Sequence, residues 1–486
     1  MNSGETSGTE NLDTEIVVIG AGGAGLAAAV TVAEKGTNVI VLEKRRTAGG
    51  STMMAQGLFA TESVAQKQQG INAPSDELFK AAMEWTHWRV NPMLIRVYIN
   101  KSADTIQWLE DKGVNLDYIP AHHHKQRFRT WHCNPENAGH LVIKALVNDC
   151  KTRGIQLFYE TEAKKILLDV QGNVTGVLAV TNGKELKIST RSIIIGTGGY
   201  GGNKELLKKY CPGYNENTTL VGAPNMGDGL LMATEIGAAT EGLGTLMMSG
   251  PNFRGSHQVS AISRQPNTIW VNRDGKRFAD EDISLWSVSA NTLRRQPDNI
   301  SYTLFDSEIK QTVIEKGTIK ISGTLSAPKL TKLGEELQFE ADKGTVKISD
   351  SWGEIARWIG TTPEVLKTTI DEYNSFCDQG YDEIFAKDRR FLQPLRTPPY
   401  YAIKCGTELL VTLGGIKINH CMEVLNQQDN PIPGLYAVGN EAGGWQWDTY
   451  SLDLAGFAFG FAINSGRIAG ENAAKYIMKD FQHNKL

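Results

Sequence analysis

Two apolar runs of four residues flank a helical pattern near the start of the chain. Residues 16–19 read IVVI and residues 39–42 read VIVL, and the alanine-rich segment 24–35 lies between them. Unbroken apolar runs of this length are typical of parallel strands that are covered on both faces. The pattern therefore predicts a strand, a helix and a second parallel strand.

The turn between the first strand and the helix reads GAGGAG, and its glycines suit a bound pyrophosphate. Gly20 permits a tight bend, Gly22 lets the backbone approach a phosphate, and Gly25 lets the helix pack against the strand. The amino end of the helix offers free N–H groups and the positive end of its dipole. Glu43 follows the second strand, where a carboxylate can accept hydrogen bonds from a ribose. The segment predicts a dinucleotide site, and a glycine-rich turn that binds nothing is the alternative.

Similar patterns recur later in the chain. Strands that run into glycine turns are predicted at 191–202 and 434–440, and helices at 204–210, 230–236 and 465–477. Asp228 stands just before one of these helices, where its side chain is expected to cap the helix. The alternation of strands and helices predicts an α/β fold with a parallel sheet.

Length and composition restrict the class of protein. A chain of 486 residues is expected to form two domains. The net charge of −4 gives no basic surface, which argues against nucleic acid as a partner. Six scattered cysteines form no CxxC pair, so free thiols are expected rather than disulfides, a zinc site or attached haem.

The ends of the chain carry no sign of a targeting or spanning segment. Residues 1–13 are polar and lack an apolar core, so a disordered leader is expected. The most apolar late stretch, 454–463, is short and interrupted by glycine, so no membrane insertion is expected. These observations predict a cytoplasmic protein that exchanges electrons with a separate donor or acceptor.

Two further motifs make a resemblance specific. Residues 48–57 read AGGSTMMAQG and residues 271–281 read VNRDGKRFADE. With the segments above, they resemble the fumarate reductase and succinate dehydrogenase flavoprotein family, which includes ketosteroid dehydrogenases and enoate reductases. The resemblance covers about residues 14–477. It implies a Rossmann-like FAD-binding domain built from residues 14–243 and 402–486, interrupted by an α+β capping domain at 244–401.

The same resemblance implies FAD rather than NAD, because the late motif GLYAVGNEAGG is similar to the family's flavin-contacting segment. It places the following residues along the cofactor: Gly20, Gly22, Gly23, Ala24, Gly25, Glu43, Lys44, Gly50, Ser51, Gly57, Gly198, Gly199, Asp228, Gly439, Asn440 and Leu454. A purely structural role is the alternative for Ser51, as a cap, and for Asp228, as part of its turn. Relatives with covalent flavin use a histidine after the AGG-like turn, and residues 51–57 contain none, so noncovalent binding is expected.

The positions that bind a dicarboxylate in the family have lost their charged side chains. The acid-bearing arginine falls at Leu285, eight residues after Arg277, and a substrate histidine falls at Val411. A second arginine falls near Asp453, whose carboxylate would repel a dianion. The remaining ligands fall near Ser249, Ser260 and Ala261. Fumarate and succinate are therefore rejected as substrates.

Aromatic residues replace them in the segment 443–454, GGWQWDTYSLDL. Trp445 and Trp447, with Met247 and Met248, suit a flat, uncharged aromatic or polycyclic ligand. Tyr450 lies eleven residues after Gly439, the offset at which ketosteroid dehydrogenases carry a catalytic tyrosine, so it is the expected acid. A core tyrosine with a satisfied hydroxyl is the alternative.

Other candidates belong to one loop. Tyr118 and His132 border a loop that could close over the ligand. Residues 122–124 are three consecutive histidines, for which a solvated loop is expected rather than a metal site, and no metal is predicted.

These observations predict a FAD-dependent oxidoreductase that reduces an activated C=C bond, an enone or enoate, of an uncharged aromatic or polycyclic substrate. Hydride comes from flavin N5 and a proton from Tyr450. Two alternatives stay open: a ketosteroid-type dehydrogenase that works in the oxidative direction, and an electron-transfer subunit without substrate chemistry.

Overall fold

A six-stranded sheet forms the centre of the larger part of the molecule. The computed structural model describes residues 10–123, 125–283, 285–320, 326–451 and 453–483. The sheet order is β19-β20-β10-β2-β3-β6, and every pairing is parallel except that of β19 with β20. Its strands are β2 (Ile16–Ile19), β3 (Val39–Leu42), β6 (Gln156–Phe158), β10 (Ser192–Ile195), β19 (Glu423–Leu425) and β20 (Pro431–Ala437). The predicted parallel sheet is confirmed, and β2 and β3 have the predicted bounds.

Helices cover this sheet and are packed through small residues. Helix α1 (Gly23–Glu34) lies against α14 (Phe457–His483) and α5 (Ala138–Thr152). A Cβ on Gly466 of α14 would collide with the carbonyl oxygen of Ala24, so the two helices need a glycine where they cross. Helix α14 begins eight residues earlier than predicted because Phe457, Phe459 and Phe461 are helical and buried. Further helices of this part are α2 (Val64–Gln68), α3 (Ser75–Trp85), α4 (Pro92–Glu110), α6 (Lys204–Tyr210) and α7 (Asp228–Glu235).

A second sheet corrects the prediction for the start of the chain. Residues 1–9 lie outside the described residues, but Glu10–Asp13 form β1, which pairs in parallel with β9 (Lys184–Ser189). The sheet continues through β8 (Val174–Thr181) to β7 (Thr161–Leu168). An edge strand is held by main-chain hydrogen bonds, so its polar side chains do not prevent pairing. The expected disordered leader is therefore wrong for these four residues.

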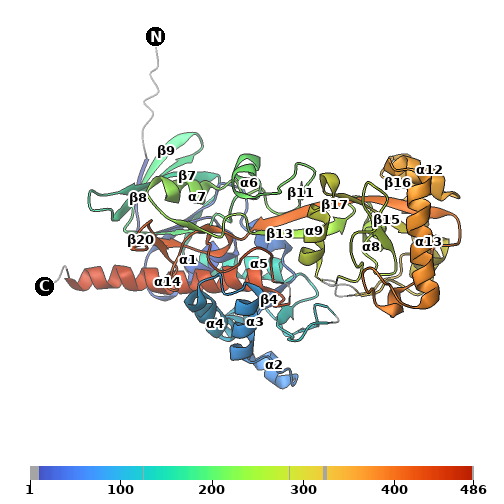
Figure 1. Ribbon diagram of the computed structural model, residues 1–486. Coiled ribbons are helices and arrows are strands. Elements are labelled where there is room, and N and C mark those ends of the chain that lie inside the picture. Colours follow the sequence, from blue (N-terminus) through green and yellow to red (C-terminus); the bar gives the residue numbers. More distant parts are fainter. Residues whose placement is uncertain (1–9, 124, 284, 321–325, 452, 484–486) are drawn as a thin grey trace, which may run out of the picture.

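The long strand β17 (Tyr400–Thr412) joins the larger part to the rest of the molecule (Figure 1). It pairs with β11 (Thr219–Leu220), β13 (Leu246–Asn252), β15 (Ile300–Phe305) and β16 (Val346–Ser349) along its length, and β14 (Ile269–Val271) pairs with β15. Figure 1 shows α12 (Trp352–Ile359) and α13 (Pro363–Gln379) at the far end of β17 from α14. The helices α8 (His257–Ile262), α9 (Trp286–Arg294), α10 (Ser307–Glu315) and α11 (Leu333–Asp342) complete this region.

The molecule has two large hydrophobic clusters. One gathers around the central sheet and includes α1 and α14. The other contains residues between Phe253 and Cys405 only. The second cluster falls in the region expected to form a cap, and the proposed boundaries at 244 and 401 stay a prediction. In the described part of the chain, no helix is both long and apolar enough to cross a membrane.

Candidate active site

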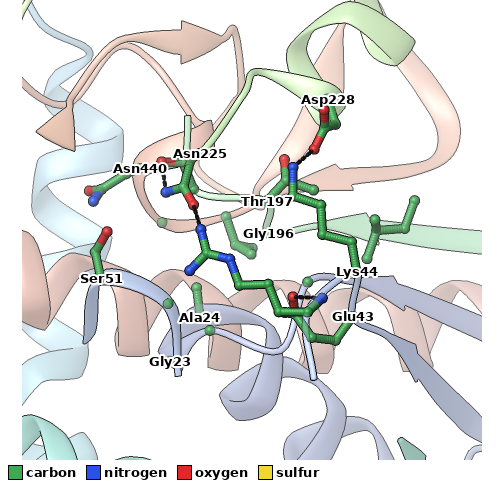
Figure 2. A pocket seen from close by; sticks show the side chains of 18 of the residues that line it. Gly23, Ala24, Glu43, Lys44, Ser51, Gly196, Thr197, Asn225, Asp228 and Asn440 are labelled. Atoms are coloured by element: carbon green, nitrogen blue, oxygen red, sulfur yellow. Dashed lines mark hydrogen bonds and ion pairs between the residues drawn. The ribbon is translucent and has the colours of Figure 1, made fainter. Parts of the chain in front are cut away.

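A cleft at the carboxyl edge of the central sheet collects most of the residues predicted to hold the cofactor (Figure 2). Parallel strands place the residues that follow them at this edge, where ligands of such folds bind. Twelve of the sixteen predicted residues line the cleft: Gly20, Gly22, Gly23, Ala24, Glu43, Lys44, Gly50, Ser51, Gly198, Asp228, Gly439 and Asn440.

The other four residues lie elsewhere. Gly25 packs beneath the cleft, where a Cβ would collide with the carbonyl oxygen of Gly20. Gly199 donates its N–H to Glu441 Oε2 at 2.9 Å. Gly57 lines a neighbouring cavity instead, and Leu454 is buried and lines neither space.

Charged and amide side chains are arranged around the open side of the cleft. Both oxygens of Glu43 accept main-chain N–H groups, from Ala21 at 2.8 Å and Arg45 at 2.9 Å, which fixes the carboxylate. Lys44 forms an ion pair with Asp228 across the cleft, as Figure 2 shows. Asp228 is the first residue of α7 and Gly227 precedes it in left-handed conformation, so the predicted capping by Asp228 is wrong.

Two lining residues carry no sequence motif and were not predicted. Arg45 donates to Asn225 Oδ1 at 3.3 Å, and Asn225 Nδ2 donates to the carbonyl oxygen of Gly198 at 2.8 Å. Both come from irregular segments whose polar residues look like ordinary loop residues in the sequence. Only the fold brings residues 45 and 225 together.

The cleft fits a dinucleotide on two observations. A Cβ on Gly22 would have no neighbour closer than the Gly49 oxygen at 4.0 Å, so the space beside this glycine is open to a ligand. Ser51 Oγ and Asn440 Oδ1 are buried and have no hydrogen-bond partner among the described residues. Buried polar atoms are rarely left unpaired, which indicates that a polar ligand satisfies them.

A second cavity of about 260 Å³ adjoins the cleft. Four residues line both spaces: Ser51, Thr52, Asn440 and Ala462. The rest of the cavity is lined by Met54, Ala55, Gln56, Gly57, His122, Trp131, Met247, Trp286, Leu410, Val411, Tyr450, Gly456, Ala458 and Phe459. No lysine, arginine, aspartate or glutamate is among these described lining residues. The cavity is therefore mainly apolar and aromatic.

Tyr450 lines this cavity and is held by the start of α14. Its side chain is 2% exposed, and its hydroxyl oxygen accepts the N–H of Ala458 at 3.0 Å. Within the described residues this hydroxyl donates no hydrogen bond, and Tyr450 lines the cavity. Burial raises the pKa of Tyr450 well above its ordinary value, which keeps the phenol protonated at neutral pH.

His122 is a lining residue that the sequence did not single out. The prediction of a solvated loop is wrong for His122 and His123, which are 4% and 7% exposed, and residue 124 lies outside the described residues. The His122 ring packs edge-on against Trp131 with centroids 4.7 Å apart. Burial lowers the pKa of His122 to about 3, so the ring is neutral. The described residues contain no cluster of three potential metal ligands.

The predicted substrate residues divide into two groups. Val411 and Met247 line the cavity, and Leu285 directly precedes its lining residue Trp286. Trp445, Trp447, Tyr118 and His132 do not line it.

Trp445 is a core residue. It is fully buried, and its ring stacks on Phe461 with centroids 4.2 Å apart. Its indole Nε1 donates to the carbonyl oxygen of Ala442 at 2.9 Å. Trp445 was expected to face an aromatic ligand, but its ring packs against α14 instead. Trp447 is half-buried against the main hydrophobic cluster, and the Arg89 guanidinium lies 5.5 Å from its ring centroid.

His132 and Tyr118 also have positions that the loop hypothesis did not foresee. His132 is fully buried in β5 (Trp131–Cys133), with Nε2 2.8 Å from Ser63 Oγ and Nδ1 3.0 Å from the carbonyl oxygen of Thr130. Burial lowers its pKa to about 4. Tyr118 is 42% exposed. Neither is placed to contact a ligand in the cavity.

Comparison with known proteins agrees with this geometry. The chain matches a family described as FAD binding domain over residues 15–452. It is 32% identical over 483 residues to the vinyl phenol reductase of Lactiplantibacillus plantarum, covering 95% of this chain and 96% of that protein.

Solved structures show the same fold. The open conformation of a flavocytochrome c3 fumarate reductase has a TM-score of 0.78 at 27% identity, covering 96% of this chain and 79% of that one. The 3-ketosteroid-delta4-(5alpha)-dehydrogenase of Rhodococcus jostii RHA1 has a TM-score of 0.76 at 21% identity, covering 97% and 99%. The chain therefore belongs to the FAD-binding flavoprotein family of the fumarate reductases, with the predicted α/β fold, and it is a FAD-dependent oxidoreductase.

Proposed function

We propose that this protein reduces the C=C bond of an uncharged, single-ring aromatic substrate that binds in the apolar cavity. FAD would bind noncovalently along the cleft, through the twelve lining residues named above. The observation that carries the proposal is the shared wall of the two spaces, formed by Ser51, Thr52, Asn440 and Ala462. A substrate in the cavity would touch the cofactor at this wall.

The cofactor and Tyr450 would supply the two hydrogens. FAD, when bound and reduced, provides a hydride. Tyr450 holds the proton that the other carbon of the double bond receives. Its oxygen already accepts the Ala458 N–H, which orients the hydroxyl, and its raised pKa keeps the proton in place until a strongly basic carbon develops.

The cavity lining selects against charged substrates. A dicarboxylate such as fumarate needs charge-assisted partners at both ends. The described lining residues offer none, and His122 is neutral because its pKa is about 3. Desolvating two carboxylates without partners would cost several kcal/mol each. The cavity therefore favours a neutral molecule, even though some relatives are named as fumarate reductases.

Size and similarity narrow the substrate class. A volume of about 260 Å³ lies at the small end of ligand sites, which favours one substituted ring over a four-ring steroid. The relative with 32% identity is named a vinyl phenol reductase. A vinyl-substituted phenol fits both points, with Trp131, Trp286 and Phe459 as aromatic walls. The electrons would come from a separate donor.

Product analysis tests this function. The purified holoenzyme is supplied anaerobically with a chemical electron donor and either 4-vinylphenol, fumarate or a 3-ketosteroid. We expect 4-ethylphenol to form, and no succinate at a comparable rate. A saturated 3-ketosteroid is mixed separately with the oxidised holoenzyme, without donor. Bleaching of the flavin by that ketone, with formation of the unsaturated product, would instead support a dehydrogenase. No reaction with any carbon substrate would support an electron-transfer subunit.

A further inference from the structure

Arg264 has no counter-ion among the described residues. It lies between α8 and β14, and its Nε is buried with no hydrogen-bond partner in the described part of the chain. No carboxylate of the described residues lies within ion-pair distance of its guanidinium. By contrast, buried Arg277 pairs with Glu281 at 2.8 Å and with Asp382 at 2.9 Å. An unpaired cation in this environment is costly, so a missing anion is indicated.

The guanidinium faces a small pocket that carries a second unsatisfied donor. Trp270 lines the same pocket, and its indole Nε1 is buried without a partner among the described residues. Lys320 also lines it and contributes a second positive charge. Two N–H donors and a lysine around one space are the features of an anion site.

The acidic residues in the lining are already neutralised. Glu281 pairs with Arg277 and, at 3.1 Å, with Lys387, and Asp282 pairs with Lys125 at 3.0 Å. Glu408 is the carboxylate whose charge acts on Arg264 from farther away, and it accepts Asn252 Nδ2 at 2.7 Å. These groups leave the charge of Arg264 locally unpaired.

Size and donor geometry identify the chemical class of the ligand. The pocket has a volume of about 50 Å³, enough for a carboxylate group with a few waters. Arginine binds a carboxylate through two parallel N–H bonds. Asn252 Oδ1 is an acceptor in the same lining with no partner among the described residues, and a water bound with the carboxylate would satisfy it.

The pocket lies beside the substrate cavity. Trp286 lines both spaces. Lys320 is also close enough to lower the pKa of His122, which lines the cavity. A group bound at Arg264 would therefore be separated from the cavity by a single side chain.

We propose that the pocket formed by Arg264, Trp270 and Lys320 binds a carboxylate, with Arg264 and the Trp270 indole as its donors. The ligand is either the acid group of a substrate whose ring occupies the cavity or a separate small carboxylate. Binding at the pocket does not depend on the proposed function, but a substrate acid group there would replace the neutral substrate proposed above by a monocarboxylate.

Fluorine NMR of trifluoroacetate with the oxidised holoenzyme tests the site without turnover. We expect saturable line broadening with the wild type that acetate reverses, and at least tenfold weaker binding to Arg264→Met. Arg264→Lys should retain part of the affinity. Arg295→Met is the matched control because Arg295 is exposed, and it should bind as the wild type does.

The same broadening with Arg264→Met, at unchanged FAD content, would mean an adventitious ion only and would overturn the site. Should that variant lose FAD, Trp270→Phe decides, since it removes one donor and keeps an aromatic ring. A threefold or greater loss of affinity supports the pocket, and an unchanged affinity refutes it.

Competition distinguishes the two sources of the carboxylate. Displacement of trifluoroacetate by 4-hydroxycinnamate at lower concentration than by acetate identifies a substrate acid. Displacement by acetate alone identifies a separate small carboxylate. Both outcomes support the carboxylate site. Because binding is measured without turnover, the result does not depend on whether 4-vinylphenol is reduced.

Discussion

At the scale of single residues, Tyr450 combines a fixed oxygen with an available proton. The Ala458 N–H holds the oxygen, and the described residues provide no acceptor for the hydroxyl proton. The two roles considered for this residue are therefore compatible: it is buried and hydrogen-bonded, and it still faces the cavity.

Replacing Tyr450 by phenylalanine removes the proton and keeps the ring. We expect turnover of 4-vinylphenol to fall about 100-fold or more, the scale of general acid catalysis, with little change in substrate binding. Because the pKa of Tyr450 is raised, the wild-type rate should not decline as the pH rises from 6 to 9. Tyr98→Phe is the control, since Tyr98 is buried beside it and donates to Phe457 instead of lining the cavity. Equal turnover in Tyr450→Phe and Tyr98→Phe would mean that Tyr450 is a structural core residue and not the acid.

The absence of a side chain at Gly22 is expected to matter for cofactor binding and not for folding. Gly22→Val should therefore give a folded protein that lacks FAD, because the side chain would occupy the space beside the pyrophosphate. Flavin absorbance per protein after purification measures this. Gly334→Val, at a position with open space around it, should retain full FAD. Stoichiometric FAD in Gly22→Val would contradict the assignment of the cleft.

Burial of His132 is expected to make the free energy of unfolding depend on pH in the acid range. Its folded pKa of about 4 lies below the ordinary value of 6.5, so the neutral form is favoured in the folded state. The resulting stabilisation of the folded state is fully present above pH 6.5. It is lost as the pH falls toward 4, and the free energy of unfolding then decreases by about 3 kcal/mol in total.

Urea unfolding across this pH range measures the effect. His132→Gln should lose less stability than the wild type between pH 6.5 and 4, and the exposed His140→Gln should follow the wild type. An equal loss of unfolding free energy in the wild type and His132→Gln over this pH range would contradict the prediction.

Sequence reasoning predicted the cofactor residues better than the cavity residues, for a physical reason. Gly20, Gly22 and Glu43 follow strands at a spacing fixed by backbone geometry, so their pattern is visible in one segment. Arg45, Asn225 and His122 reach their sites from irregular segments, and only the fold brings them there. Trp445 was assigned to the substrate because aromatic side chains serve cores and ligands equally well.

At the scale of elements, the segment between β20 and α14 forms one side of the catalytic region. Trp445 stacks on Phe461 and lies against Phe457 of α14, and Ala458 of the same helix holds Tyr450. The packing of this segment on the helix therefore sets the position of the proposed acid.

Trp445→Ala should accordingly act on stability. Loss of a fully buried indole is expected to cost about 3–5 kcal/mol of unfolding free energy. Trp447→Ala, at a half-buried position, should cost less than Trp445→Ala. Urea unfolding of both variants compares them. An unchanged stability of Trp445→Ala with a raised KM would restore it as a substrate residue.

The elements themselves were predicted well where their pattern was strong. The strands β2 and β3 and the helix α6 have their predicted bounds because apolar runs and turn residues mark their ends. The strand β1 was missed because an edge strand needs only main-chain partners, and its polar sequence, ENLD, gives no burial signal.

At the scale of the whole molecule, β17 connects the two hydrophobic clusters. Its tyrosine-rich start pairs with β16 and β15, and its end pairs with β13 beside the cavity residues Leu410 and Val411. The sequence indicated a separate region after residue 243 through its resemblance to the family. It could not indicate that one strand spans both parts, because pairing between distant segments leaves no local pattern.

The central claim is that the cavity beside the flavin cleft reduces a neutral aromatic alkene. Stopped-flow mixing of the chemically reduced holoenzyme with 4-vinylphenol or fumarate, without oxygen, tests it most directly. We predict rapid, saturable return of oxidised-flavin absorbance with 4-vinylphenol and none with fumarate on that timescale. Reoxidation by fumarate at a comparable or higher rate, or by neither compound, would contradict the claim.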